Sequence, residues 1–568
     1  MPRGNRLSWL LALYFTAVLV AGCGHSGSSD DNATDMDTDS DGDGFADRMD
    51  VDDDNNGLIE IKNLQQLDWM RNDLAGTSLK DNLGNADANG CPVGGCNGYE
   101  LVADLDFDTD SNGAMDAGDA FFDYDGAGSA TGWLPVGAPG TPFSASFDGN
   151  GHAISNLYID RAADDYVGLF GQVDGTGGRV EIRGLQLDGA LASVSGHDYV
   201  GLLAGFATTD VDISGNGAAG IVAGNDAVGG MVGRAAVDVS FSNNSADGTV
   251  SGVAGVGGLV GTVITGVTLD NNTASGSVTG NVAVGGFAGE LTTDVTCNSN
   301  SADAQVSGGG ITGGFVGSVS DDVSVNNNFA AGDVTGVTET GGLAGRARNT
   351  VTISNSYATG DVDVTGDFSG GLVGRANTNT ADGPVTIQRS FATGSIAGAV
   401  DGSYMGGLVG ISYNLDVQDS FATGAVSGVN FVGGLVGDAN LQTNVGKSFA
   451  VNNVTGTSNT GGFVGWSDTA TYNSNYVSSS TVPAGAFGNI HTATGTEGSG
   501  VLVRATAQMQ CPTRAADPAC SPNMYFDWDS TYSGGDRIVW NYGSSSQLPG
   551  LVIGGVVYRD GDADGALD

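Results

Sequence analysis

The chain has 568 residues, including 97 Gly and only 11 Pro, and a formal net charge of −46 at pH 7. A surface of this sign repels phosphates, which excludes nucleic acid as a partner. No Gly-X-Y period exists, which excludes a collagen. The apolar residues, 40% of the chain, recur at fixed spacing, which excludes a disordered linker.

Residues 1–22 have the features of a secretory signal. Arg3 and Arg6 precede an apolar stretch over residues 7–20, which is short for a membrane span. The stretch ends in Leu-Val-Ala-Gly before Cys23, which resembles a bacterial lipobox and implies lipidation of Cys23. Because Gly24, and not Asp, follows Cys23, the resemblance implies an anchor in the outer membrane. The alternative is an ordinary signal peptide with an incidental Cys. Residues 23–36 are polar and are predicted to be a flexible tether, so the lipid would be the only membrane contact of an exported surface protein.

Four Asp-rich segments match the spacing of a calcium loop, which places oxygen ligands on alternate residues around a Gly at position 6. The ligand positions are, in chain order, Asp39, Asp41, Asp43, Asp47 and Asp50; Asp52, Asp54, Asn56 and Glu60; Asp108, Asp110, Asn112, Asp116 and Asp119; and Asp560, Asp562, Asp564 and Asp568. The first two segments overlap within 37–60, and the fourth lies in the tail 556–568. The second segment has Asn63 at position 12, and the flanking helices of an EF-hand are missing. Calcium is the predicted cofactor, and an acidic solvated tether is the alternative.

Residues 61–160 are predicted to form an N-terminal cap that carries the third loop and one short helix over residues 63–74. Cys91 lies close to Cys96 in sequence, and Cys511 lies close to Cys520. Export favours two local disulfides. A four-cysteine zinc site is the weaker alternative, because both spacings are poor and no His is near.

One motif, small/apolar-Gly-Gly-apolar-small-Gly, recurs eleven times within residues 161–480. Most intervals between its closing glycines are 28 residues; the longest insertions precede Gly205 and Gly410. Other positions keep the same phase. An apolar row contains Ile213, Phe241, Leu269, Cys297, Val325 and Ile353; an amide row contains Asn216, Asn244, Asn272, Asn300 and Asn328; an aromatic row contains Phe329, Tyr357, Phe391, Phe421, Phe449 and Tyr476.

These rows predict an all-β fold, a parallel β-helix (β-solenoid) of about eleven 28-residue coils. In stacked coils, residues of equal phase lie above one another about 4.7–4.9 Å apart. The apolar row then fills the core, the amides form a ladder at a turn, and the aromatics stack. A right-handed coil is expected by analogy. Residues 481–555 are predicted to cap the second end, with Trp528, Trp540 and Tyr542 as packing residues.

The Gly-Gly-Leu-Val-Gly core, followed by Asn-Asn, Ala-x-Gly and Val-x-Gly, resembles the GLUG motif of bacterial surface proteins. The segments near residues 57–61, 98–101 and 147–154 also resemble the flanking regions of those proteins. The resemblance therefore covers about residues 50–555. The overlapping acidic loops resemble thrombospondin type 3 repeats. The resemblance implies a repeat fold at the cell surface, and the motif carries no known catalytic residues. Some members of the family are IgA-cleaving metalloproteases. This chain has no His-Glu-x-x-His motif, so the resemblance does not imply that activity.

No catalytic constellation is evident. The four His residues share no spacing suited to a metal, the Arg residues of the central coils are scattered, and Cys297 falls in the apolar row. A further row, Asp210, Asp238, Asp294 and Asp322, is broken by Gly266; it is either an acidic strip for cations or sugars or, as we favour, a set of turns.

We therefore expect a lipid-anchored surface protein with a structural, adhesive or ligand-binding role, whose ligand is a glycan or a protein. The alternative is a polysaccharide lyase or hydrolase. Clustered carboxylates with an Arg on one face would favour it, and the insertions before Gly374 and Gly410 are where such a site would be sought.

Overall fold

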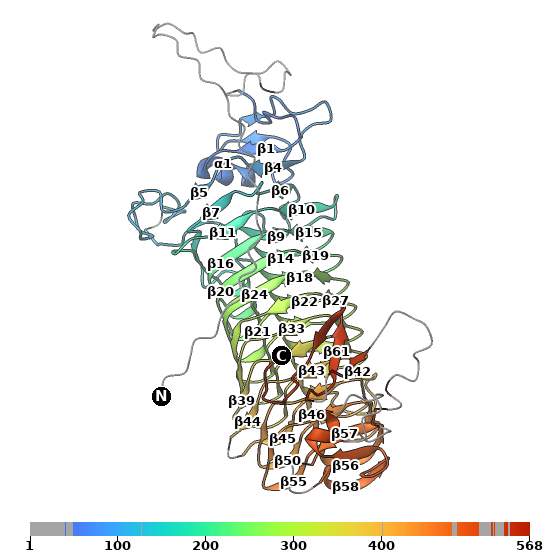
Figure 1. Ribbon diagram of the computed structural model, residues 1–568. Coiled ribbons are helices and arrows are strands. Elements are labelled where there is room, and N and C mark those ends of the chain that lie inside the picture. Colours follow the sequence, from blue (N-terminus) through green and yellow to red (C-terminus); the bar gives the residue numbers. More distant parts are fainter. Residues whose placement is uncertain are drawn as a thin grey trace, which may run out of the picture.

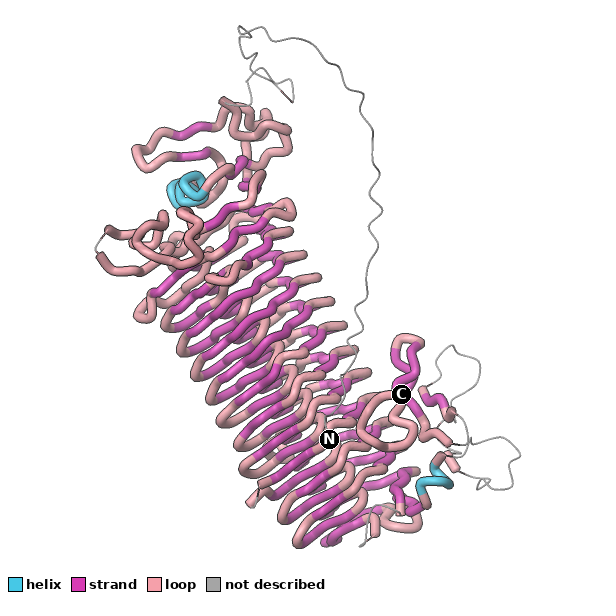
Figure 2. Tube along the Cα trace, turned by 60° about the vertical axis from the view of Figure 1, so that its left-hand side comes forward, coloured by secondary structure: helices cyan, strands magenta, loops and turns pink. Residues whose placement is uncertain are grey.

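The computed structural model describes residues 40, 49–126, 128–399, 401–479, 485–510, 524–525, 528, 539–543 and 546–568. These residues are nearly all β and form a parallel solenoid of about 11 turns with ~28 residues per turn, which confirms the predicted fold class. Figure 2 shows the strands of successive coils stacked along a rod. Cys23, Asp39, Asp41, Asp43 and Asp47 lie outside the described residues, as do Cys511 and Cys520.

A representative coil contains four strands, β22 (Val260–Val263), β23 (Thr268–Asp270), β24 (Thr273–Thr279) and β25 (Val282–Gly285). The first two lie in a 25-stranded sheet, β24 in a 22-stranded sheet and β25 in a 10-stranded sheet. Each pairs in parallel with the strand one repeat away, for example Leu269 with Cys297. Because side chains alternate along a strand, the apolar residue of each strand points into the coil and is buried.

From Gly230 onward, a glycine before the apolar core residue of each repeat allows the coils to approach closely, whereas Leu202 stands at this phase one coil earlier. A Cβ on Gly258 would lie 2.1 Å from the carbonyl oxygen of Gly286, and one on Gly286 would lie 2.2 Å from that of Gly314. No side chain fits at these distances. The recurrence of Gly at this position is therefore a requirement of coil stacking.

The Asn row forms the predicted ladder inside the solenoid. The Nδ2 of Asn244 donates to Oδ1 of Asn272 at 2.9 Å and to the carbonyl of Ile213 at 2.8 Å. Asn216, Asn272 and Asn300 repeat this pattern. Asn328, the last of the row, donates to the carbonyls of Cys297 and Asn326. All five amides are almost completely buried. Each one satisfies backbone groups at a turn that water cannot reach.

The acidic row is a set of turns, as favoured from the sequence. Asp210, Asp238, Asp294 and Asp322 have φ between 51° and 65°, and Gly266, which interrupts the row, has φ 64°. Asp and Gly are among the residues that tolerate this left-handed conformation. The left-handed backbone of this turn therefore explains why Asp or Gly recurs at this position.

The N-terminal region consists of irregular coils. Its strands β1 (Ile59–Ile61), β4 (Gly98–Leu101) and β6 (Ser146–Asp148) pair in parallel with one another and with β10 (Val180–Arg183) of the solenoid. The expected helix is α1 (Leu64–Trp69), and the Asn63 side chain accepts a hydrogen bond from the N–H of Gln66 at its start. A 3-10 turn (Met70–Asn72) follows. The second acidic segment leads into β1, the third lies in the long connection between β4 and β6, and a disulfide joins Cys91 to Cys96.

The second end differs from the expected cap. A last coil is formed by β58 (Phe487–Thr494) and β59 (Val501–Arg504), followed by α2 (Thr506–Met509). The chain then turns back along the side of the solenoid, where β60 (Trp540–Asn541), β61 (Gly550–Ile553) and β62 (Val556–Tyr558) form an antiparallel sheet. In Figure 1, β61 lies beside β42 (Val385–Gln388) and β43 (Phe391–Ala392), well before the end of the rod.

The returning segment covers the aromatic row, which lies on the outside of the solenoid. Rings in successive coils stack at 4.7 to 5.3 Å with interplanar angles of 1° to 6°, from Phe329 to Phe449. Trp540 packs on Phe449 and Tyr558 packs on Tyr357. The outer aromatics therefore have a second hydrophobic core above them, separate from that of the coils.

Candidate functional site

Three of the four predicted calcium loops are described, and they share one backbone arrangement. The carboxylate at position 1 accepts hydrogen bonds from the N–H groups at positions 5 and 6: Asp52 from Asn56 and Gly57 at 3.0 and 2.9 Å, Asp108 from Asn112 and Gly113 at 3.1 and 3.0 Å, and Asp560 from Asp564 and Gly565 at 3.1 and 3.0 Å. The Gly at position 6 has φ between 80° and 91° in all three. The same local sequence thus produces the same turn at both ends of the chain.

The third loop gathers its carboxylates best. Oxygen atoms of Asp108, Asp110 and Asp119 lie within 4.8 Å of one another. Asp119, at position 12, also accepts from the backbone N–H of Asp116 at 2.9 Å, and Asn112 donates to Asp116 at 3.2 Å. These are hard oxygen ligands, the type that calcium prefers. Three of the five predicted side chains thus converge, and Asn112 is hydrogen-bonded to Asp116 beside them.

The second loop departs from the predicted ligand set. Glu60, at position 9, forms an ion pair with Lys62 at 2.7 Å. Glu100 of the next coil, which stands in register with Glu60, accepts a hydrogen bond from Nδ2 of Asn56 at 3.0 Å. Burial raises the pKa of Glu100 to about 7. The sequence alone did not indicate Glu100, because only strand pairing brings it to the loop.

The first loop is described at one predicted ligand, Asp50. Its side chain is buried and accepts a hydrogen bond from the N–H of Asp52 at 2.8 Å.

In the fourth loop, three of the four predicted side chains lie close together. Oxygen atoms of Asp560, Asp562 and Asp564 lie within 4.8 Å of one another, whereas Asp568 receives a hydrogen bond from Gln547 at 3.4 Å. Burial raises the pKa of Asp560. The loop contacts the solenoid, since a Cβ on Gly565 would lie 3.2 Å from the carbonyl oxygen of Thr393. A cation here would fasten the returning segment to the coils.

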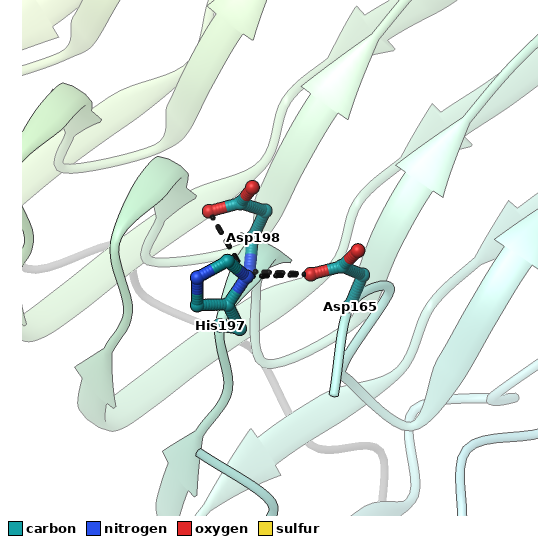
Figure 3. Close-up of side chains that lie close together, drawn as sticks. All are labelled: Asp165, His197 and Asp198. Carbon is teal, nitrogen blue, oxygen red and sulfur yellow. Dashed lines mark hydrogen bonds and ion pairs between the residues drawn. The ribbon is translucent and has the colours of Figure 1, made fainter. Parts of the chain in front are cut away.

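A cluster that sequence spacing did not indicate lies at a corner of the first coils. Nδ1 of His197 is 2.9 Å from Asp165 and 3.5 Å from Asp198, and Figure 3 shows both carboxylates directed at this one nitrogen. The hydrogen bond that the imidazole donates to Asp165 raises the pKa of His197, and the negative charge of Asp198 adds to the effect. Asp198 also accepts from Nδ2 of Asn225 at 2.8 Å. The arrangement suits a protonated imidazole that links neighbouring coils.

The outward face near the insertions carries charges and aromatic rings. Glu339, largely buried, forms ion pairs with Arg346 and, at 3.2 Å, with Arg375. The two Arg residues, which look scattered in the sequence, stand in register on adjacent coils. Beside them Phe368, Tyr404 and Phe431 stack at 4.9 and 4.7 Å from positions with φ of 55° to 68°. The cluster has the Arg residues that the enzymatic alternative calls for, but one carboxylate in place of a group of carboxylates.

Two other residues of interest have buried side chains. Cys297 is fully buried in the core, and burial raises the pKa of its thiol, as expected for a residue of the apolar row. Asp438, on the outward row, is 6% exposed, and burial raises its pKa to about 6. Tyr404, Asp468 and Tyr472 are the titratable groups near it.

Within the described residues, no helix has the length and apolarity that a membrane crossing requires.

Comparison with known proteins gives partial similarities. No family model matches the chain. Halomucin of Haloquadratum walsbyi is 38% identical over 127 residues, which are 21% of this chain and 1% of that protein. A "Putative Gly-rich membrane protein" of Evansella cellulosilytica is 32% identical over 108 residues, 19% of this chain and 10% of that protein. Among solved structures, a "putative immunoglobulin A1 protease" from Bacteroides ovatus has a TM-score of 0.35 and 20% identity, over 54% of this chain and 77% of that one. The matched segments span a small fraction of the two curated relatives.

Proposed function

We propose that this protein is a calcium-stabilised binding rod of the bacterial cell surface, anchored through lipid on Cys23 and related to GLUG-motif surface proteins. The observation that carries the proposal is the identical turn of the three described acidic loops, two at the N-terminal end of the solenoid and one against its side beside Thr393. Calcium at these loops stiffens the segments that leave the coils. The rod between them offers long regular columns of outward side chains, the kind of surface on which solenoids bind ligands.

An exported location agrees with this role. A protein that is 32% identical to this chain over 108 residues is named as a membrane protein. The Cys91–Cys96 disulfide agrees with an oxidising compartment. The high negative charge keeps such a rod soluble and attracts cations.

The test is calcium titration of the chain without residues 1–23, by calorimetry and thermal melting. Several bound ions and a melting temperature that rises with calcium support the proposal. Magnesium at equal ionic strength is the control for simple charge screening, because Mg²⁺ demands a tighter octahedral site. An equal response to both ions, or no response, contradicts a calcium role and leaves an acidic tether.

A second candidate function is polysaccharide processing, for which the Glu339–Arg346–Arg375 cluster beside Tyr404 supplies Arg residues and one carboxylate on one face. Incubation with a panel of acidic and neutral polysaccharides, followed by assay of new chain ends, tests it. Glu339→Gln abolishes cleavage if this carboxylate acts on the substrate, whereas Glu181→Gln, at an exposed site on β10, leaves it unchanged. Absence of cleavage by the unaltered chain rules the enzyme out for that panel.

A further inference from the structure

A cavity of about 680 Å³ lies between the side of the solenoid and the hairpin of the returning C-terminal segment. This volume is within the usual range of small-molecule sites, about 300–1,000 Å³. One wall is polar and belongs to the coils, with Asn327, Asn355 and Arg389. The other is apolar and contains Val539, Val552 and Ile553.

The three polar residues occupy the same turn of successive coils. Their φ angles are 57°, 51° and 49°, so each takes the left-handed conformation that this corner requires. Their backbones are linked coil to coil, since the N–H of Asn355 donates to Gln388 and that of Arg389 donates to Gln418. Repetition of one turn therefore places two amides and a guanidinium in a line along the cavity.

The hydrogen-bonding capacity of this wall is only partly used. Nδ2 of Asn327 donates to Oγ of Ser299 at 3.0 Å, and Nδ2 of Asn355 donates to Oδ1 of Asn326 at 2.8 Å. Within the described residues, the amide oxygens of Asn327 and Asn355 accept no hydrogen bond, and the Arg389 guanidinium has no ion pair or side-chain hydrogen bond. The wall thus offers acceptors from two amides and the five donors of a permanent cation.

These features select a class of ligand. A sugar ring presents hydroxyl donors at its edge and C–H groups on its faces, which match amide oxygens and an apolar wall of Val and Ile. A carboxylate on the ring matches the planar guanidinium, which binds such groups bidentately.

We propose that this cavity binds an acidic sugar unit, a uronic acid, of a polysaccharide. Arg389 holds the carboxylate, Asn327 and Asn355 accept from the hydroxyls, and the hairpin wall covers one face of the ring. The proposal rests on the binding role proposed above and names the class of its ligand.

The test is calorimetric titration with trigalacturonate and with the neutral trisaccharide galactotriose, at one fixed calcium concentration. Binding of the acidic trisaccharide, at least roughly tenfold tighter than the neutral one, supports the proposal. Equal binding of both sugars, or binding of neither, overturns it. Inorganic phosphate is titrated separately, and phosphate binding as tight as that of trigalacturonate would overturn the assignment to a sugar.

The repeat supplies a conservative variant. Arg389→Asn introduces the residue that stands at this turn in the two preceding coils, so the backbone accepts it. We expect affinity for trigalacturonate to fall roughly tenfold or more with an unchanged melting temperature. Lys447→Asn is the matched control, since Lys447 has φ 50° in the same column and does not line the cavity. Equal losses in both variants would indicate attraction by charge alone and overturn the proposal. A calcium response without sugar binding defeats this inference and leaves the calcium-stabilised rod standing.

Discussion

The indole Nε1–H of Trp540 donates a hydrogen bond to Oδ1 of Asp419 at 3.0 Å, although 121 residues separate them. Asp419 lies at a turn of the solenoid with φ 50°, and Trp540 belongs to the segment that returns along its side. Trp540 is 1% exposed and contacts Phe421, Phe449 and Trp528. The contact fixes where the C-terminal segment lies on the rod.

Trp540→Ala should release this segment and leave the coils folded. The loss of a buried Trp costs about 3–5 kcal/mol, more than a small antiparallel sheet is expected to tolerate. We expect rapid proteolysis after residue 504 together with an unchanged circular dichroism signal from the solenoid. Trp466→Ala, at a half-buried outward position on a regular coil, is the control. Resistance of the Trp540 variant to protease would show that the segment is held by other contacts.

Replacement of a position-1 aspartate should remove one calcium ion. Asp108→Ala loses a ligand and the hydrogen bonds to the N–H groups of Asn112 and Gly113. We expect the calorimetric stoichiometry to fall by one and the calcium-dependent rise in melting temperature to shrink. Asp247→Ala, an exposed strand residue, should leave both unchanged. An unaltered stoichiometry in Asp108→Ala would remove the third loop from the calcium sites.

Gly286→Ala should disturb the stacking of the coils. The new methyl group would lie 2.2 Å from the carbonyl oxygen of Gly314, so the coils must separate. Overpacking of this kind costs about 1–3 kcal/mol, which lowers the melting temperature. Gly177→Ala places its Cβ in open space at a non-left-handed position and should have little effect. Equal stability of the two variants would contradict a steric role for the repeated Gly.

Asp438 should make the solenoid less stable as pH rises from about 4 to 6. Its pKa is raised from 3.8 to about 6 in the folded chain, so between these values the folded state binds the extra proton. Stability therefore falls through this window, by up to about 3 kcal/mol, and the full penalty persists at neutral pH.

Asp438→Asn removes this penalty, and its melting temperature should exceed that of the unaltered chain at pH 7.5 by more than at pH 4. The difference between the two chains isolates Asp438 from the general repulsion among acidic groups. Asp363→Asn, at an exposed strand position, controls for the loss of one charge. A pH-independent difference would show that Asp438 is ionised without cost.

The amino-acid sequence determined the coils, their rows and the acidic loops. A constant 28-residue phase places Asn244 above Asn216 and Tyr357 above Phe329, because equal phase in a stacked coil means vertical contact. The turn of each acidic loop is equally local, since its hydrogen bonds span four and five residues.

Tertiary structure alone decided which distant segments meet. Glu100 reaches the second acidic loop, His197 reaches Asp165 and Trp540 reaches Asp419 across separations that are not multiples of the repeat. The aromatic row has the same period whether it faces the core or the outside. The burial of Ala330 inside the coil, beside a half-exposed Phe329, shows that the row lies on the outside, and the returning C-terminal segment forms both the second core and the cavity beside Arg389. The repeat period determines which residues are neighbours along the rod. Contacts between a repeat and a non-repeating segment depend on the course of that segment, which the period does not determine.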